Sequence, residues 1–165
     1  MIIEPSQQEI MLIKAINLSF SGKFHKPARV TEYKVNDPED YDVEGESVEE
    51  FFKDYSWEDI DLKYASGYLL GYLNTDAFLY YLPAFLIKVL EDHKPDNDFT
   101  DRFFRTLCNL EYWGKNKSTL MSSLSNEHKS IIYLTCKEVS ERALCYDTEF
   151  QSISKQYKQS VNKLL

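Results

Sequence analysis

The chain has 165 residues, of which 43% are hydrophobic and 28% charged, with only 5 Gly and 5 Pro. This is the size and composition of one globular domain and excludes a disordered, collagen-like or disulfide-dense chain. A formal net charge of -8 argues against binding to a phosphate backbone, so we expect no nucleic-acid partner.

The first predicted element is a helix over residues 7–21. Ser6 and Glu9 have the spacing of a capping box, in which each residue's side chain accepts a hydrogen bond from the other's backbone N–H. Apolar residues then recur at helical intervals until Gly22 interrupts the pattern. They are Ile10, Ile13, Ile16 and Phe20.

Residues 23–46 lack apolar periodicity and contain Pro27 and Pro38, so we predict a long loop there. The alternation of Val30, Glu32 and Lys34 supports at most one short strand pair. Loops of more than 20 residues are uncommon in compact domains and are often functional.

Two short helices are predicted next, because Ser47 with Glu50 and Ser56 with Asp59 have capping spacings. The apolar stretch 62–73 is interpreted as helix or turn. It contains Gly67 and Gly71, which lower helix propensity but permit close approach of another backbone.

Residues 77–90 are predicted to form the central helix, since they are hydrophobic almost all round and follow the cap-type residues 74–76. Pro83 either kinks this helix or starts a second one after a break near Tyr81. The aromatic run from Phe78 to Phe85 is typical of a buried core helix; lining of a ligand pocket is the alternative.

Three more helices are predicted downstream, over residues 98–110, 126–144 and 147–165. Leu124 and Ser125 have the pattern of a hydrophobic staple and an N-cap, and 147–165 is a C-terminal amphipathic helix. The fold class is therefore all-α: a single-domain irregular bundle of about six helices spanning residues 1–165.

The chain also resembles a bacterial family of small proteins of unknown function. The resemblance covers residues 51–139 and depends on Trp57, on the Tyr-Leu-Pro-Ala-Phe segment 81–85 and on the capped helix that follows Leu124. It implies a mostly helical, cytoplasmic bacterial protein and supplies no catalytic residues. Leu79 stands where that family often has Arg, and His128 where it has Gln.

Charge placement is the most informative functional signal. Residues 37–61 contain twelve acidic residues and one basic residue, Lys53. We interpret this segment either as a solvated surface or as a binding surface for a basic protein, which it would attract by electrostatic steering. The candidate partner-binding residues are Asp37, Glu39, Asp40, Asp42, Glu44, Glu46, Glu49 and Glu50.

The sequence predicts no metal site, no cofactor and no catalytic residues. Residues 40–46 match the first half of a calcium loop, with oxygen ligands at positions 1, 3 and 5 and Gly at 6, but Phe51 occupies position 12, where a bidentate Glu is needed. An irregular calcium or magnesium site is a weak alternative. The three histidines lack zinc-site spacing, and Cys108, Cys136 and Cys145 are expected to be free thiols.

These observations favour a non-enzymatic protein-interaction module that uses the acidic segment, and an immunity or inhibitor type is one such module. A small enzyme or ligand-binding domain with an aromatic-lined pocket is the alternative. We expect a cytoplasmic location, because residues 1–8 include no basic residue and no secretion signal is apparent. No membrane span is expected either, because the stretch 77–90 is too short. The oligomeric state is left open.

Overall fold

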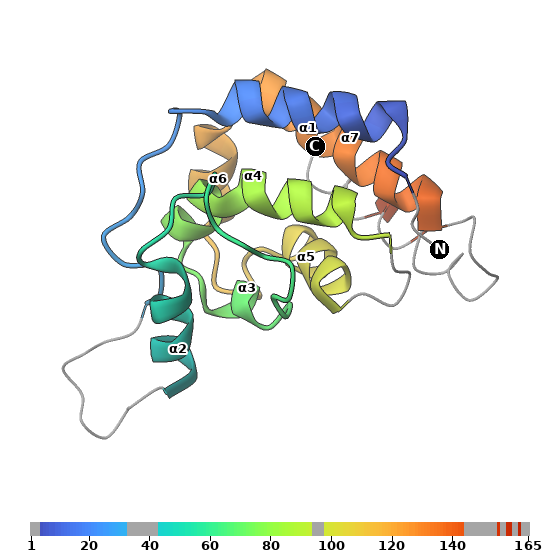
Figure 1. The fold of residues 1–165 in the computed structure, drawn as a ribbon. Coiled ribbons are helices and arrows are strands. Elements are labelled where there is room, and N and C mark those ends of the chain that lie inside the picture. The colour runs from blue at the N-terminus through green and yellow to red at the C-terminus, as the bar shows by residue number, and fades with distance from the viewer. Residues whose placement is uncertain are drawn as a thin grey trace.

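The computed structural model describes residues 4–32, 43–93 and 98–143 and the single positions 155, 158, 159 and 162. Seven helices form an irregular all-α bundle across these residues (Figure 1), as predicted. No strand occurs within these ranges, and an isolated antiparallel bridge joins Thr31 to Leu73. The helices are α1 (Gln7–Phe20), α2 (Val43–Phe52), α3 (Leu69–Tyr72), α4 (Thr75–Glu91), α5 (Asp98–Cys108), α6 (Lys117–Ser123) and α7 (Asn126–Ala143).

The predicted central helix is confirmed as α4. It lies between the α1 and α7 pair on one side and α5 on the other (Figure 1). The Asn74 side chain caps it by accepting a hydrogen bond from the Ala77 backbone at 2.8 Å. Pro83 lies inside one continuous helix, so the predicted alternative of a break near Tyr81 is wrong.

Aromatic rings fill the core around α4. Phe78, Tyr81 and Phe85 are completely buried, and the Phe85 ring contacts those of Phe99 and Phe103 with centroids 5.8 and 6.4 Å apart. Such tilted and edge-on arrangements are favourable because they bring ring edges towards ring faces.

The first helix begins where the capping box predicts. The Ser6 backbone N–H donates to Glu9 Oε2 at 2.7 Å, and the Glu9 backbone N–H donates to Ser6 Oγ at 3.1 Å. α1 then buries Leu12, Ile16 and Phe20 and packs along α7 and α4. Two of these three, Ile16 and Phe20, are among the apolar residues whose helical spacing predicted this helix.

Ser125 caps α7, also as predicted, and His128 completes the cap. Ser125 Oγ accepts from the His128 backbone N–H at 3.1 Å, while His128 Nδ1 accepts from the Ser125 backbone N–H at 3.2 Å. This leaves the proton on Nε2, which donates to the Ser19 carbonyl at 2.9 Å. The imidazole also stacks on Phe20, with centroids 4.3 Å apart.

Several predictions between residues 23 and 73 need correction. The second helix begins at Val43 and not at Ser47, so residues 43–46 are not loop as predicted. Residues 33–42 of the predicted loop lie outside the described residues. The helix expected after Ser56 is only a turn, closed by hydrogen bonds from the Asp59 and Ile60 backbones to the Ser56 carbonyl. The stretch 62–73 consists of turns and the short helix α3, as predicted.

At the C-terminal end, the amphipathic helix predicted over 147–165 falls mostly outside the described residues. Its four described positions, Lys155, Lys158, Gln159 and Asn162, are helical and exposed. Among the residues that the structure describes, no helix has both the length and the apolar character needed to span a bilayer.

Candidate functional site

Four of the eight predicted partner-binding residues, Asp37, Glu39, Asp40 and Asp42, lie outside the described residues. The other four, Glu44, Glu46, Glu49 and Glu50, are all on α2, which projects from the bundle (Figure 1).

Three of these four carboxylates are exposed. Glu50 forms an ion pair with Lys53 at 2.8 Å, and the hydrogen bond and positive charge of Lys53 hold the pKa of Glu50 below its usual value. Glu44 accepts a hydrogen bond from the hydroxyl of Tyr72. Glu46 is exposed on the same helix.

Glu49 instead has an internal role. Its carboxylate accepts hydrogen bonds from the backbone N–H groups of Val30 and Thr31 and from the Thr31 hydroxyl, at 3.0 to 3.1 Å. The contact attaches the segment before residue 32 to α2. This carboxylate therefore supplies the hydrogen-bond acceptor that two backbone donors need.

The exposed negative charge continues past α2. The next four acidic residues of the chain, Asp54, Glu58, Asp59 and Asp61, are all exposed. Tyr55 and Tyr64, which are 50% and 88% exposed, accompany them. The exposed tyrosines supply apolar area beside this charge, and tyrosine is enriched in protein interfaces.

This segment forms one wall of an open groove of about 700 Å³. The other wall is a face of α4, with Asn17 of α1 also in the lining. We call it the acidic groove. Its lining residues are Asn17, Trp57, Glu58, Ile60, Asp61, Leu62, Lys63, Tyr64, Ala84, Ile87, Lys88, Glu91 and Asp92.

Hydrogen bonds from α4 hold the wall in place. The Tyr81 hydroxyl is 2.8 Å from the Phe52 carbonyl and 2.7 Å from that of Tyr55. Burial raises the pKa of Tyr81, so it stays a protonated donor. The Tyr80 hydroxyl is hydrogen-bonded to the Trp57 backbone.

Lys88 of α4 attaches the same wall at Lys63. Its Nζ donates to the Lys63 carbonyl at 3.2 Å and lies 3.4 Å from Asp92 Oδ2, and both side chains are largely buried. It also lies over the Phe99 ring, 5.6 Å from the centroid. The positive charge of Lys88 is thus balanced within the fold.

With Lys88 and Asp92 paired, three carboxylates and one ammonium group remain in the lining. They are Glu58, Asp61, Glu91 and Lys63. No ion pair joins any of the three carboxylates to a cation within the described ranges. The groove therefore combines an apolar floor with an excess of negative charge.

The aromatic run considered as an alternative pocket lining lies elsewhere. Phe78, Tyr81 and Phe85 are fully buried against other rings and are not part of the groove lining. Of the residues between 78 and 85, only Ala84 lines the groove.

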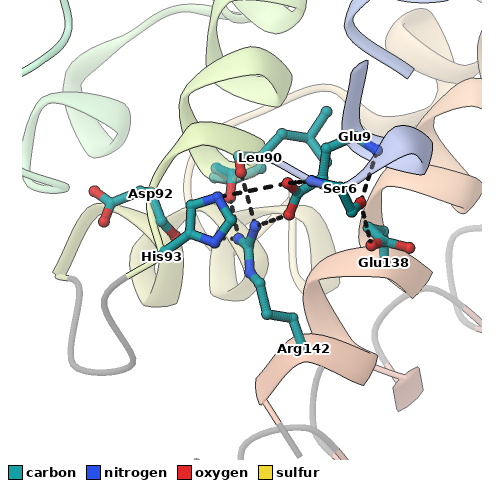
Figure 2. A network of polar contacts seen from close by, with 8 residues as sticks. Ser6, Glu9, Leu90, Asp92, His93, Glu138 and Arg142 are labelled. Carbon is teal, nitrogen blue, oxygen red and sulfur yellow. Dashed lines mark hydrogen bonds and ion pairs between the residues drawn. The ribbon is translucent and has the colours of Figure 1, made fainter. Parts of the chain in front are cut away.

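A second polar cluster joins three helices (Figure 2). Arg142 of α7 donates to Glu9 of α1 at 2.5 Å and to the carbonyls of Val89, Leu90 and Asp92 at 2.7 to 3.1 Å. His93 Nε2 is 3.5 Å from the Glu9 carboxylate. The guanidinium satisfies carbonyls at the end of α4, a structural role that suits a cation at a helix C-terminus.

Lys115 is the most unusual buried ionisable group. It is 2% exposed, and Nζ donates to the carbonyls of Trp113 and Gly71 at 2.8 and 3.4 Å. Burial lowers its pKa to about 8. Because Lys115 is buried, we assign it a structural role: its hydrogen bonds join α3 to the segment before α6.

For metals, the described residues contain no group of three or more His, Cys, Asp or Glu side chains able to hold an ion. The partial calcium loop, residues 40–46, lies half outside these residues. Cys108 and Cys136 are not joined in a disulfide, and burial raises the pKa of Cys136. Cys145 lies outside the described ranges.

Comparisons with family models, with curated proteins and with solved structures find no match to this chain.

Proposed function

We propose that this protein is a non-enzymatic module that binds a basic protein partner through the acidic segment 44–61 and the acidic groove. The observation that carries the proposal is the groove itself, which has an apolar floor and three carboxylates without an ion pair in the described structure. An inhibitor or immunity-type role fits a small module of this kind, with a toxic basic protein as its target.

The physical basis of the interaction has two parts. Clustered carboxylates raise the rate of encounter with a basic surface, an effect that salt screens over about 8 Å at physiological ionic strength. Tyr55 and Tyr64 then supply exposed aromatic area, which contributes most of the binding energy in many interfaces.

We propose a bacterial cytoplasm as the setting. The bacterial source is proposed from the resemblance noted in the sequence of residues 51–139, and the buried thiol of Cys136 suits a reducing compartment. The partner is accordingly sought among soluble basic proteins of the same cell.

The test compares two variants of equal net charge in affinity capture from a lysate of the source organism. One carries Glu46→Gln, Asp54→Asn and Glu58→Gln within the acidic segment; the control carries Glu4→Gln, Glu111→Gln and Glu141→Gln, all at exposed positions outside it. We expect one basic protein to be held by the wild type and the control and lost by the segment variant.

The association rate with the purified partner is then measured at two salt concentrations. We expect it to fall steeply as salt increases for the wild type, and less steeply for the segment variant. Equal capture by both variants, or a partner without net positive charge, would contradict the proposal.

A further inference from the structure

We infer that the acidic groove is the docking site for one short segment of the partner, in which an apolar side chain is flanked by lysine or arginine. This inference rests on the proposed function and names the partner chemistry that the groove recognises. It follows from three features: the apolar floor of the groove, the positions of its carboxylates, and the hydrogen bonds that attach the wall formed by residues 57–64 to α4.

The hollow arises from one small side chain on α4. Tyr80, Ala84, Ile87, Lys88 and Glu91 are spaced so that they share one face of the helix. The other four side chains of this row are larger, whereas Ala84 contributes only a methyl group. Ala84 therefore leaves space on this face of the helix, and it lines the groove.

The floor is apolar. Besides Ala84, it includes Trp57 and Leu62, which are almost fully buried, and Ile60 and Ile87, which are half-buried. An aliphatic side chain placed there would remove apolar surface from water on both molecules. Charge alone does not explain such a floor, so the occupant must carry an apolar group.

Carboxylates stand on both walls. Glu58 and Asp61 belong to the turn segment, and Glu91 belongs to the last turn of α4. Lys88 is already paired with Asp92, so it does not offset these charges. A segment with cations on both sides of its apolar residue matches this distribution.

The wall needs no rearrangement to receive the segment. Tyr80, Tyr81 and Lys88 attach it to α4 at Trp57, at Phe52 and Tyr55, and at Lys63. A site held in its binding geometry loses little conformational entropy when it is occupied. Binding of a short peptide is therefore measurable without the rest of the partner.

The test uses three synthetic pentapeptides as probes: Lys-Lys-Leu-Lys-Lys, Lys-Lys-Gly-Lys-Lys and Glu-Glu-Leu-Glu-Glu. The chain has two tryptophans, and Trp57 lines the groove. A Trp113→Phe protein therefore reports occupancy through Trp57 fluorescence. Titration calorimetry on the wild type gives the same affinities if that variant folds poorly.

We expect the leucine probe to bind at least about tenfold more tightly than the glycine probe, because only leucine buries a side chain on the floor. We expect no binding of the acidic probe. Equal affinities for the leucine and glycine probes would overturn the inference, since the floor would then play no part.

Two groove variants and one control locate the site. Ala84→Leu fills the floor without changing the charge, and Glu58→Gln with Glu91→Gln removes one carboxylate charge from each wall. Glu4→Gln with Glu111→Gln removes the same charge at two exposed positions outside both the groove and the acidic segment. We expect a loss of at least about tenfold for each groove variant and less than about twofold for the control.

The outcomes separate this inference from the proposed function. Equal losses in the two charge variants, or unchanged binding in Ala84→Leu, would overturn the groove as the docking site. The role of the acidic segment is judged separately by the capture experiment. Failure of the capture experiment together with specific probe binding would remove the proposed partner and retain the groove. Concentration-dependent self-association that Ala84→Leu abolishes would show a second copy as the occupant and overturn the inference.

Discussion

Arg142 donates a hydrogen bond of 2.5 Å to Glu9, a carboxylate that is only 2% exposed, and so joins α7 to α1 across 133 residues of sequence. The same guanidinium binds three carbonyls at the end of α4. One side chain thus holds together the three helices that surround one side of the core.

Replacing Glu9 is expected to destabilise the protein strongly. Glu9→Gln leaves the Arg142 charge largely buried without its anionic partner, which costs about 3 kcal/mol in the free energy of unfolding. Glu141→Gln is the control, because Glu141 is exposed and its contact with Lys137 is 4.0 Å long; its effect stays within about 0.5 kcal/mol. Urea unfolding measures both, and equal effects would contradict a structural role for the buried pair.

Lys115 is expected to give the stability an unusual pH dependence. Its pKa is lowered by burial to about 8, against about 10.4 in an unfolded chain. Between these values the unfolded state binds more protons than the folded state, so the contribution of Lys115 to stability rises with pH. Tyr81 and Cys136 act in the opposite direction, because burial raises their pKa values.

Tyr81 and Cys136 are present in both the wild type and Lys115→Met, so their contributions to the pH dependence cancel when the two proteins are compared. The difference in unfolding free energy between wild type and variant should shift in favour of the wild type by about 1 kcal/mol per pH unit between pH 8 and 10. Below about pH 7, where Lys115 is protonated in both states, it should be nearly constant. Urea unfolding at pH 7, 8, 9 and 10 measures it, and a constant difference throughout would show that the Lys115 pKa is not lowered.

His128 is expected to stabilise α7 by two separable contributions. His128→Gln keeps an acceptor for the Ser125 backbone N–H but loses the ring stacked on Phe20, and should cost about 1 kcal/mol. His128→Ala loses both, and should cost about 2 kcal/mol. Thermal and urea unfolding distinguish the two variants. Equal costs would mean that the cap contributes nothing measurable.

The two glycines near α3 are expected to respond in opposite ways to alanine. A Cβ at Gly67 would lie 2.5 Å from Arg102 Cβ and 2.6 Å from the Asp98 carbonyl, so Gly67→Ala should cost about 1–3 kcal/mol. At Gly71 the nearest atoms belong to Trp113, at 3.8 Å. Gly71→Ala should be neutral or stabilise by up to about 1 kcal/mol. A large cost at both positions would contradict this geometry.

Local signals in the sequence located the longer helices well. The capping residues Ser6, Asn74 and Ser125 accept the hydrogen bonds expected of them, because a cap involves only residues three positions apart. Periodicity over ten or more residues likewise depends on one helix alone. Gly67 allows the close approach that was predicted from its lack of a side chain, whereas Gly71 makes only an ordinary contact.

Short helices were harder to predict. α2 begins at Val43, four residues before the expected cap at Ser47, although Glu44 and Glu46 in its first turn are a signal for a helix N-terminus. No prediction was made for α6, whose seven residues are too few for a clear periodicity. Asn116 caps it, accepting from Thr119 at 3.0 Å.

The acidic groove itself was not visible in the sequence, although the charge beside it was. Trp57 and Ala84 come together only because Tyr80 and Tyr81 bind the backbone of the segment before residue 58. Such long-range contacts follow no local spacing rule. The sequence signal for the groove is Ala84, a small side chain among larger ones on the face of α4 that runs from Tyr80 to Glu91.

The distance in sequence between Glu9 and Arg142 also bears on synthesis. A ribosome adding 5–20 residues per second needs on the order of ten seconds to make the 133 residues between them. Throughout that interval, the face of α1 that packs on α7 has no partner within the nascent chain. A chaperone that covers Phe20, whose ring stacks on His128 of α7 in the folded chain, would protect the half-made protein from aggregation.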